Sequence, residues 1–389
     1  MLSHPLVHNT TSNSMQIAIP KEIKKQEYRV GLLPSVAYQL VQQGHTVLVE
    51  RGAGEDTGYP DADYEQAGAK LIDDHEALFA EGDLVVKVKE PLPEEYGLLR
   101  PGQVLFTYFH LAADRELTEA VCRSGVTALA YETIEVNGRL PLLEPMSEIA
   151  GRMSVLVGGY FLARHFGGAG ILLGGVAGVL PGRVMVLGGG VAGVNAARMA
   201  TGLNADVTIL EVDVERMRFL DITLHTAHTL YSSEAHILEQ LPRVDLLIGA
   251  VLVPGAAAPK LISADLIQRM PSGSVLVDVA IDQGGCAQTS KPTTHAEPTY
   301  VVDEVVHYCV ANMPGGVART ATQALNNATL PFVQALAEKG VARALREDAH
   351  LANGLNVSHG ALCNAEVGAA LDLPVQSLEE ALATLGSAS

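Results

Sequence analysis

The chain of 389 residues contains no tryptophan, and aromatic side chains make up only 5% of it. Cationic side chains are also scarce: 26 lysines and arginines stand against 44 aspartates and glutamates, for a formal net charge of −18. Such a charge repels nucleic acids and anionic membranes, and few rings are available to stack on bases. We therefore expect small-molecule ligands, with neither a nucleic acid nor a membrane as partner.

Cysteine is rare as well. The four cysteines are widely separated and show neither a CxxC pair nor the Cys/His spacing of a metal site: Cys122, Cys286, Cys309 and Cys363. Thiols used in this way are typical of a reducing compartment and do not indicate a disulfide framework. We expect buried free thiols, a cytoplasmic location and no metal.

Long hydrophobic runs are limited to one stretch. Residues 167–194 carry a single charge, Arg183, and would be long enough to cross a bilayer. Pro181 and many glycines interrupt the stretch, which favours two apolar strands joined by a glycine-rich turn. Residues 1–14 lack the basic start and apolar centre of a signal peptide, and we expect a disordered extension there.

Short β-branched runs alternate with stretches of helical length along most of the chain. The predicted strands fall in two series, 16–20, 45–50, 83–89, 103–109 and 126–132, then 183–188, 207–213, 244–253, 274–282 and 299–306. This rhythm predicts an α/β protein of two doubly wound, Rossmann-like domains with a cleft between them. The expected domains are 15–142 with 319–389, whose last part packs as helices on the first sheet, and 143–318.

A glycine pattern opens the second series. Gly188-x-Gly190-x-x-Gly193 follows an apolar strand and precedes a helix, the arrangement in which a helix N-terminus receives a pyrophosphate. The next predicted strand ends in Glu211 and Asp213, about 20 residues on, where an acid binds the ribose of NAD. These features predict an NAD site, and an ordinary strand–helix turn with a solvated acid is the alternative.

Three stretches of the first domain offer groups for nicotinamide chemistry, which needs a proton carrier and cations for an acidic substrate. His110 follows an apolar strand, Lys87 and Lys89 share one strand face, and Arg29 lies in a loop before a helix. Taken singly, each has an ordinary structural interpretation: a structural histidine, a solvated strand edge and a surface charge.

The second domain adds an acid at the end of a buried run, Asp282 in "VLVDVAIDQGGC". Together with "PKEIK…YRVGLLP", "VKVKEPLPEEY", "FTYFHLA", "PMSEIAGRMS", "TSKPTTH" and "YCVANMPG", this stretch resembles the alanine dehydrogenase family, within the alanine dehydrogenase and transhydrogenase NAD-binding superfamily. The resemblance runs in order from Met15 to about Leu373, over long and specific motifs.

The resemblance implies an NAD-dependent oxidoreductase that converts L-alanine reversibly to pyruvate and ammonium, as a homohexamer. It implies His110 and Asp282 as the acid/base pair, and Arg29, Lys89, Met146 and Asn312 as substrate-binding residues. The cofactor-binding residues that the turn and the resemblance together indicate are Ser147, Gly188, Gly190, Val191, Ala192, Gly193, Glu211, Arg216, Ser232, Val251, Asp282 and Asn312.

Three alternatives remain at this stage. The soluble NAD(H)-binding component of a proton-translocating transhydrogenase shares the fold, and would pass hydride onward without amino-acid chemistry. A saccharopine- or lysine-type dehydrogenase would take a larger substrate. An inactive NAD-binding scaffold would lack turnover altogether, although the set of cations and acids argues against it.

Overall fold

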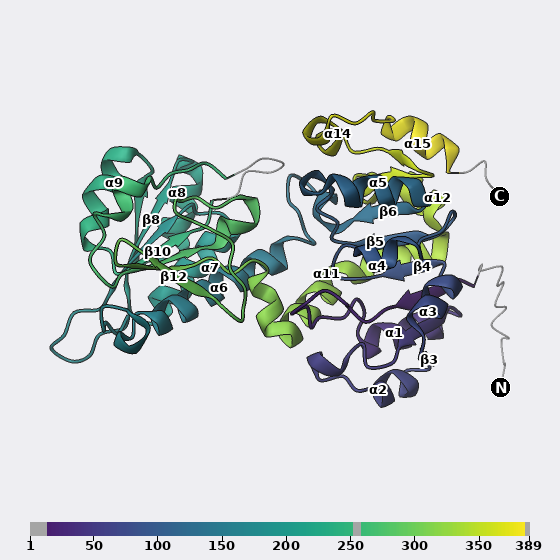
Figure 1. Ribbon diagram of the computed structural model, residues 1–389, viewed down its shortest axis with the longest axis horizontal. Coiled ribbons are helices and arrows are strands. Elements are labelled where there is room, and N and C mark those ends of the chain that lie inside the picture. Colours follow the sequence, from purple (N-terminus) through teal and green to yellow (C-terminus); the bar gives the residue numbers. More distant parts are fainter. Residues whose placement is uncertain (1–13, 252–257, 386–389) are drawn as a thin grey trace, which may run out of the picture. The chain divides into compact units, whose positions relative to one another are not determined.

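The computed structural model describes residues 14–251 and 258–385, so the extension predicted for residues 1–14 lies, apart from Ser14, outside the described residues. The chain forms two compact units. Unit 1 comprises the chain up to Leu143 and again from Ala318, and unit 2 comprises Glu144–Val317. Each unit has a sheet with helices on both faces (Figure 1).

The sheet of unit 1 has eight strands, β1 (Gln16–Ile19), β2 (Thr46–Glu50), β3 (Lys70–Ile72), β4 (Leu84–Val86), β5 (Val104–Thr107), β6 (Thr127–Ala130), β14 (Leu355–Ser358) and β15 (Ala361–Leu362). Their order is β15-β14-β6-β5-β4-β1-β2-β3. The first six strands are parallel, whereas β14 and β15 are antiparallel additions at one edge. The parallel part therefore has the doubly wound order 3-2-1-4-5-6.

The helices of unit 1 are α1 (Pro34–Gln42), α2 (Asp61–Gln66), α3 (His75–Glu81), α4 (Pro93–Tyr96), α5 (Arg115–Ser124), α11 (Ala318–Lys339), α12 (Val341–Glu347), α13 (Ala349–Ala352), α14 (Ala365–Leu371) and α15 (Leu378–Thr384). Helix α1 begins with Pro34 at its first position, and the chain leaves it through Gly44 with φ +92°, as the sequence predicts. The C-terminal segment does return to the first sheet as helices, but it also supplies β14 and β15, which the sequence analysis did not predict.

Unit 2 contains β7 (Arg183–Leu187), β8 (Asp206–Glu211), β9 (Ala227–Tyr231), β10 (Leu246–Gly249), β11 (Val275–Asp278), β12 (Thr299–Val302) and β13 (Val305–Tyr308). Their order is β12-β13-β11-β10-β7-β8-β9, parallel except for β12. The helices are α6 (Glu144–Phe161), α7 (Val191–Gly202), α8 (Val214–Thr223), α9 (Glu234–Gln240) and α10 (Ala264–Ile267). Strands β9-β8-β7-β10-β11-β13 repeat the order 3-2-1-4-5-6.

Alternate residues of β7 explain why the strand is a continuous apolar run. Val184 and Val186 pack into one core cluster of unit 2, and Met185 and Leu187 pack into the other. A parallel strand covered by helices on both faces needs apolar side chains on both. The prediction of a mostly parallel, doubly covered sheet is confirmed.

Two predictions for unit 2 were wrong. The single strand predicted for 299–306 is a hairpin of β12 and β13, turned by Asp303 and Glu304 at positive φ. Residues 167–194 supply only β7 and the start of α7, because 167–182 form an irregular segment with one isolated bridge between Val176 and Val179. The glycines of this segment weaken any strand, so the first of the two expected strands does not form.

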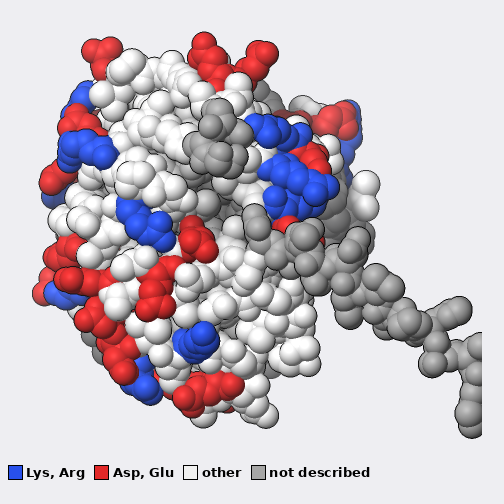
Figure 2. All heavy atoms as spheres, turned by 90° about the vertical axis from the view of Figure 1, so that its right-hand side faces the viewer, with Lys and Arg blue, Asp and Glu red and all other residues white. Residues whose placement is uncertain are grey.

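The side chains of the described residues fit the composition. All four cysteines are free thiols, and three of them are buried, while Cys122 is half-buried. Basic and acidic side chains are interspersed on the face drawn in Figure 2. Within residues 14–251 and 258–385, no helix is long and apolar enough to cross a membrane.

Candidate functional site

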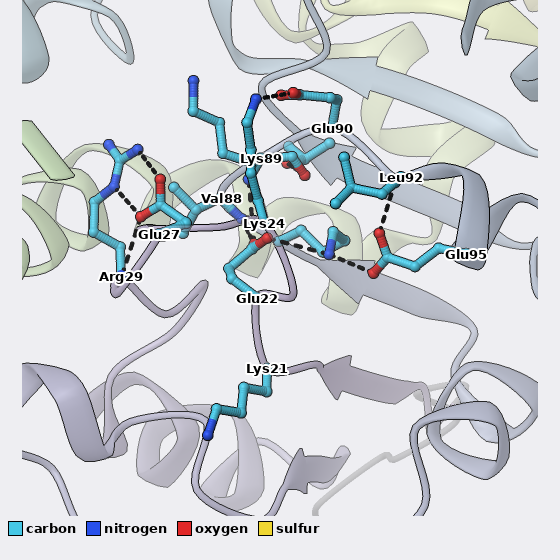
Figure 3. Close-up of polar contacts among 12 residues, drawn as sticks. Lys21, Glu22, Lys24, Glu27, Arg29, Val88, Lys89, Glu90, Leu92 and Glu95 are labelled. Atoms are coloured by element: carbon cyan, nitrogen blue, oxygen red, sulfur yellow. Dashed lines mark hydrogen bonds and ion pairs between the residues drawn. The ribbon is translucent and has the colours of Figure 1, made fainter. Parts of the chain in front are cut away.

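In unit 1 the strand order reverses between β1 and β4. At such a reversal in a doubly wound sheet, the loops after the two strands leave on opposite faces and open a crevice at the carboxyl ends. Strand β1 ends at Ile19 and β4 ends at Val86. The segments that follow them carry the charged residues drawn in Figure 3, among them Arg29 and Lys89. The topology therefore brings both predicted substrate-binding cations to the position where doubly wound sheets bind ligands.

Arg29 is 2% exposed and is held by an acid two residues before it. Its Nε donates to Oε1 of Glu27 at 2.7 Å, and its Nη2 donates to Oε2 at 2.6 Å. Burial by itself lowers the pKa of Arg29, but the Glu27 carboxylate outweighs burial and raises that pKa above its ordinary value. The guanidinium is thus a fixed, permanently charged fork. Sequence reasoning missed Glu27, although its spacing from Arg29 was visible.

Lys87 and Lys89 lie beyond the end of β4, not on a strand face as predicted. Lys87 is fully buried, with its Nζ 2.6 Å from Oε1 of Glu95 and 3.2 Å from Oε2 of Glu22. Because β4 is a central strand, the solvated-edge interpretation is wrong for Lys87. Lys89 is half-buried, and its side chain is directed away from this cluster in Figure 3.

Glu22, from the segment after β1, completes this cluster. Its Oε1 accepts hydrogen bonds from the backbone N–H groups of Val88 at 2.6 Å and Lys89 at 3.2 Å. Burial raises the pKa of Glu22 above its ordinary value, although Lys87 opposes the shift. Glu22 thus connects the segment that follows β1 to the one that follows β4, and sequence reasoning did not identify it.

His110 is exposed and stands three residues beyond β5, which ends at Thr107. It adopts a left-handed conformation, with φ 54° and ψ 39°, at the start of a short 3₁₀ turn. The carboxylate of Glu132 supports this conformation by accepting the backbone N–H of His110 at 2.6 Å and that of Phe109 at 3.1 Å. The imidazole is stacked on Tyr108, with ring centroids 6.1 Å apart. A strained histidine fixed at a strand end is typical of a functional position.

The glycine turn of unit 2 has the geometry that a pyrophosphate needs. Gly188 has φ +90°, and a Cβ on Gly193 would lie 1.8 Å from the carbonyl oxygen of Gly188, so both positions require glycine. A Cβ on Gly190 would meet nothing within 4 Å, and α7 begins directly after it with Val191 and Ala192. The N-terminus of α7 is therefore open to an anion.

Two charged side chains bind the middle of this turn. Oε2 of Glu211, at the end of β8, accepts from the N–H of Gly189 at 2.7 Å. Arg216 donates from Nε to the carbonyl oxygen of Gly189 at 2.6 Å. The turn thus brings together the predicted ribose acid and Arg216. Asp213, the second acid of the pattern, is the N-cap of α8 and accepts from two of its backbone N–H groups.

The run that contains Asp282 differs from its prediction. Strand β11 ends at Asp278, and Asp282 lies four residues later, exposed in the 3₁₀ turn Val279–Gln283. The buried acid is Asp278, whose Oδ2 accepts from the N–H of Cys286 at 2.8 Å and from the hydroxyl of Ser290. Asp278 therefore holds the loop through its side chain, whereas the side chain of Asp282 is exposed.

The remaining predicted residues lie in unit 2, next to its sheet. Met146 and Ser147 belong to the first turn of α6, and Met146 is buried. Ser232 follows β9 and donates its N–H to the carbonyl oxygen of Glu211 at 2.8 Å, and Val251 follows β10. Asn312 is half-buried with φ 59°. No group of three potential metal ligands occurs within the described ranges.

Family models match both parts of the chain. The description "Alanine dehydrogenase/PNT, N-terminal domain" applies to residues 18–150, and "Alanine dehydrogenase/PNT, C-terminal domain" applies to residues 154–365. The alanine dehydrogenase of Halomonas elongata is 59% identical over 361 residues, which is 92% of this chain and 97% of that protein. Alanine dehydrogenase 2 of Staphylococcus aureus is 51% identical over 95% of this chain and all of that protein.

Solved structures agree with these matches. An L-alanine dehydrogenase superposes with a TM-score of 0.89 at 54% identity, covering 92% of this chain and 99% of its own. A transhydrogenase from Sinorhizobium meliloti has a TM-score of 0.78 at 25% identity, over 89% of this chain and 99% of that one. The transhydrogenase is thus the more distant of the two. By fold, by sequence and by the motifs at both strand switch points, the chain belongs to the alanine dehydrogenase/PNT family.

Proposed function

We propose that the chain is an L-alanine dehydrogenase that oxidises L-alanine with NAD and water to pyruvate, ammonium and NADH, reversibly. The observation that carries this proposal is identity of 51–59% to alanine dehydrogenases over more than nine-tenths of the chain. Arg29 supports it, because Glu27 holds its guanidinium in place as a fixed positive charge, which suits the carboxylate of a small amino acid or keto acid.

In this proposal unit 1 binds the substrate and exchanges protons with it. Arg29 grips the substrate carboxylate, and Lys89 donates to the carboxylate and to the carbonyl oxygen of pyruvate. His110 exchanges the protons that are released when water adds to the iminium carbon and when the resulting carbinolamine expels ammonia. The exposed imidazole, fixed from the backbone side by Glu132, supports this role because its two nitrogens stay available while its main chain is held.

Unit 2 binds the cofactor in this proposal, since its glycine turn fits a pyrophosphate and its acid fits a ribose. NAD, when bound, supplies the hydride acceptor for the Cα–H bond of alanine. The N-terminus of α7 would hold the pyrophosphate, with Gly188, Gly190, Val191, Ala192 and Gly193 forming the turn around it. Ser147, Arg216, Ser232 and Val251 line the nucleotide, Met146 and Asn312 adjoin substrate and nicotinamide, and Asp282 is the second proton carrier.

Glu211 makes the proposed site selective for NAD over NADP. Its carboxylate is fixed at the end of β8 by the N–H of Gly189, where a 2′-phosphate would bring about two negative charges against it. Like charges about 4 Å apart cost from about 1 kcal/mol in water-like surroundings to about 4 kcal/mol at an effective dielectric of 20. Arg216 offsets part of this cost, so we expect NAD to be preferred at least about tenfold in kcat/KM.

A Glu211→Ser variant tests this selectivity, and its effect should come chiefly from improved use of NADP. Steady-state kinetics with both cofactors on the parent and on Glu211→Ser provide the measurement. Equal efficiency of the parent with NAD and NADP would show that Glu211 does not face the ribose.

The wider organisation is part of the same proposal. Residues 15–142 with 319–389 act as the substrate and catalytic domain, and residues 143–318 act as the NAD-binding domain. We propose a homohexamer, as the family resemblance implies, that works in the cytoplasm, where its four free thiols stay reduced.

An assay of the purified chain distinguishes this function from the transhydrogenase alternative. We expect NAD reduction with L-alanine as the only donor, and NADH oxidation only when pyruvate and ammonium are both present. Glycine, L-serine and L-lysine in place of alanine define the substrate range. A chain that binds NADH tightly but reduces no NAD with alanine would instead be a hydride-carrying module.

A further inference from the structure

The three residues that follow β4 have a partner for each main-chain polar group. The N–H of Lys87 donates to the carbonyl oxygen of Phe106 at 3.1 Å, and the carbonyl of Lys87 accepts from the Tyr131 hydroxyl at 2.9 Å. The carbonyl of Val88 accepts from the N–H of Tyr108 at 3.3 Å, and that of Lys89 accepts from the Thr107 hydroxyl at 2.9 Å. The two remaining groups, the N–H groups of Val88 and Lys89, both donate to Oε1 of Glu22. Glu22 is thus the acceptor that completes the backbone of this segment.

The location of that acceptor is costly. Glu22 and Lys87 are both buried, and removing two charges from water opposes folding even when they pair. Apolar side chains of similar volume would avoid the cost of burying the two charges. Such side chains could not accept the two N–H groups, which would then be buried without partners. An acceptor at this position is therefore required by the two N–H groups, and hence by the conformation of residues 87–89, and the ion pair with Lys87 does not account for it.

We propose that Glu22 is a positioning residue for Lys89, with Lys87 as its buried counter-ion. This inference rests on the proposed role of Lys89 in binding the substrate carboxylate and carbonyl. Because Glu22 fixes the peptide planes on either side of Val88, it sets the direction in which the Lys89 side chain leaves the backbone. A displacement of about 1 Å at a substrate-positioning group can cost about 100-fold in rate.

Two double variants isolate this role. In Glu22→Gln/Lys87→Met the amide oxygen still accepts from both N–H groups, whereas in Glu22→Leu/Lys87→Met it is replaced by methyl groups. Both variants replace Lys87 and so remove its ion pairs with Glu22 and Glu95 alike, and the two variants differ only at residue 22. Glu95 keeps the N–H of Leu92 at 2.8 Å and the imidazole of His75 at 3.4 Å in both.

We expect the KM for pyruvate to stay within about threefold of the parent value in the Gln variant and to rise at least about tenfold in the Leu variant. The Kd for NADH, measured by fluorescence, should be the same in both, because Glu22 belongs to unit 1 and the glycine turn belongs to unit 2. Equal KM values for pyruvate in the two variants, at equal NADH affinity, would overturn the proposal.

Amide hydrogen exchange supplies a measurement that does not depend on turnover. The amides of Val88 and Lys89 should exchange at least about tenfold faster in the Leu variant than in the Gln variant. Unchanged protection of those amides would overturn the positioning role even in an active enzyme. If the parent did not oxidise alanine, the proposed function would be rejected. Faster exchange in the Leu variant than in the Gln variant would still show that Glu22 holds residues 88 and 89.

Discussion

At the scale of single residues, three glutamates hold the groups to which we assign substrate chemistry. Glu27 binds the guanidinium of Arg29, Glu22 binds the backbone at Lys89, and Glu132 binds the backbone at His110. Each carboxylate accepts at least two hydrogen bonds, so it is satisfied where it lies and rigidifies its neighbour. The groups that we assign to substrate chemistry are therefore held in place by acids.

The acid/base assignment predicts a loss of turnover without a loss of cofactor. We expect His110→Ala and Asp282→Asn each to lower kcat by about 100-fold or more, the usual size for a proton-transferring group. Both side chains are exposed, so neither substitution opens a cavity in the core. Steady-state rates and a fluorescence titration with NADH are the measurements. Turnover near the parent value in either variant would exclude that residue from proton transfer.

Arg29 should not tolerate lysine, because Glu27 engages two nitrogens of one planar fork. Arg29→Lys keeps the charge opposite Glu27 but removes the bidentate geometry. We expect kcat/KM for pyruvate to fall about tenfold to 100-fold, which corresponds to about 1.5–3 kcal/mol for a charged hydrogen bond.

Arg29→Ala is the contrasting variant, because it leaves Glu27 buried and unpaired and should destabilise the fold by about 3–5 kcal/mol. Thermal melts separate the two effects. If Arg29→Lys uses pyruvate as well as the parent does, the carboxylate is held elsewhere.

At the scale of elements, the strands that position the site could be predicted from composition, whereas their ends could not. β1, β2 and β5 were found because they are buried on both faces and rich in β-branched or apolar residues. β3 and β9 were missed since their residues are mostly half-buried or exposed and carry no apolar run. Strand ends depend on which neighbour supplies the next hydrogen bond, so Lys87 and Asp282 were placed on strands that had already ended, and His110 directly after a strand that ends at Thr107.

His75, at the start of α3, links this helix to two other elements. Its Nδ1 lies 2.7 Å from Oε2 of Glu50 on β2, and its Nε2 lies 3.4 Å from Oε1 of Glu95 on α4. The nearby carboxylates of Glu50 and Glu95 raise the pKa of His75 to about 9. A raised histidine pKa stabilises the fold fully below the unfolded value near 6.5, and this contribution is lost as the pH rises through the folded value.

We therefore expect the free energy of unfolding of unit 1 to fall by up to about 3 kcal/mol between pH 6.5 and 9. His75→Gln should flatten this part of the profile, because glutamine carries no titrating charge. Urea unfolding at several pH values is the measurement, and His350→Gln, at an exposed histidine of the same unit, is the control. A His75→Gln profile as steep as that of the parent would show that His75 is not the titrating group.

At the scale of the whole molecule, the chain uses one topological order twice. Both units have parallel strands in the order 3-2-1-4-5-6, and in each unit proposed binding residues follow the first strand, β1 or β7. The alternation of strands and helices and the glycine pattern were sufficient to predict this organisation and the glycine turn before α7. Two of the supporting glutamates, Glu132 and Glu22, could not be predicted, because their partners lie 22 to 67 residues away in sequence.

Binding of the cofactor to unit 2 alone makes a prediction about unfolding. A ligand present at 100 times its Kd stabilises the state that binds it by about 2.7 kcal/mol. For a unit of this size that corresponds to a rise of about 5–10 °C in the melting temperature. Calorimetry with and without NADH is the measurement, and helix-cap variants identify the transition that moves.

Asp213→Ala removes the N-cap of α8 in unit 2, and Ser377→Ala removes the capping box of α15 in unit 1, each at a cost of about 1 kcal/mol. NADH should raise the transition that Asp213→Ala lowers. If NADH instead raised only the transition that Ser377→Ala lowers, the cofactor would bind unit 1, and the assignment of the glycine turn as its site would be wrong.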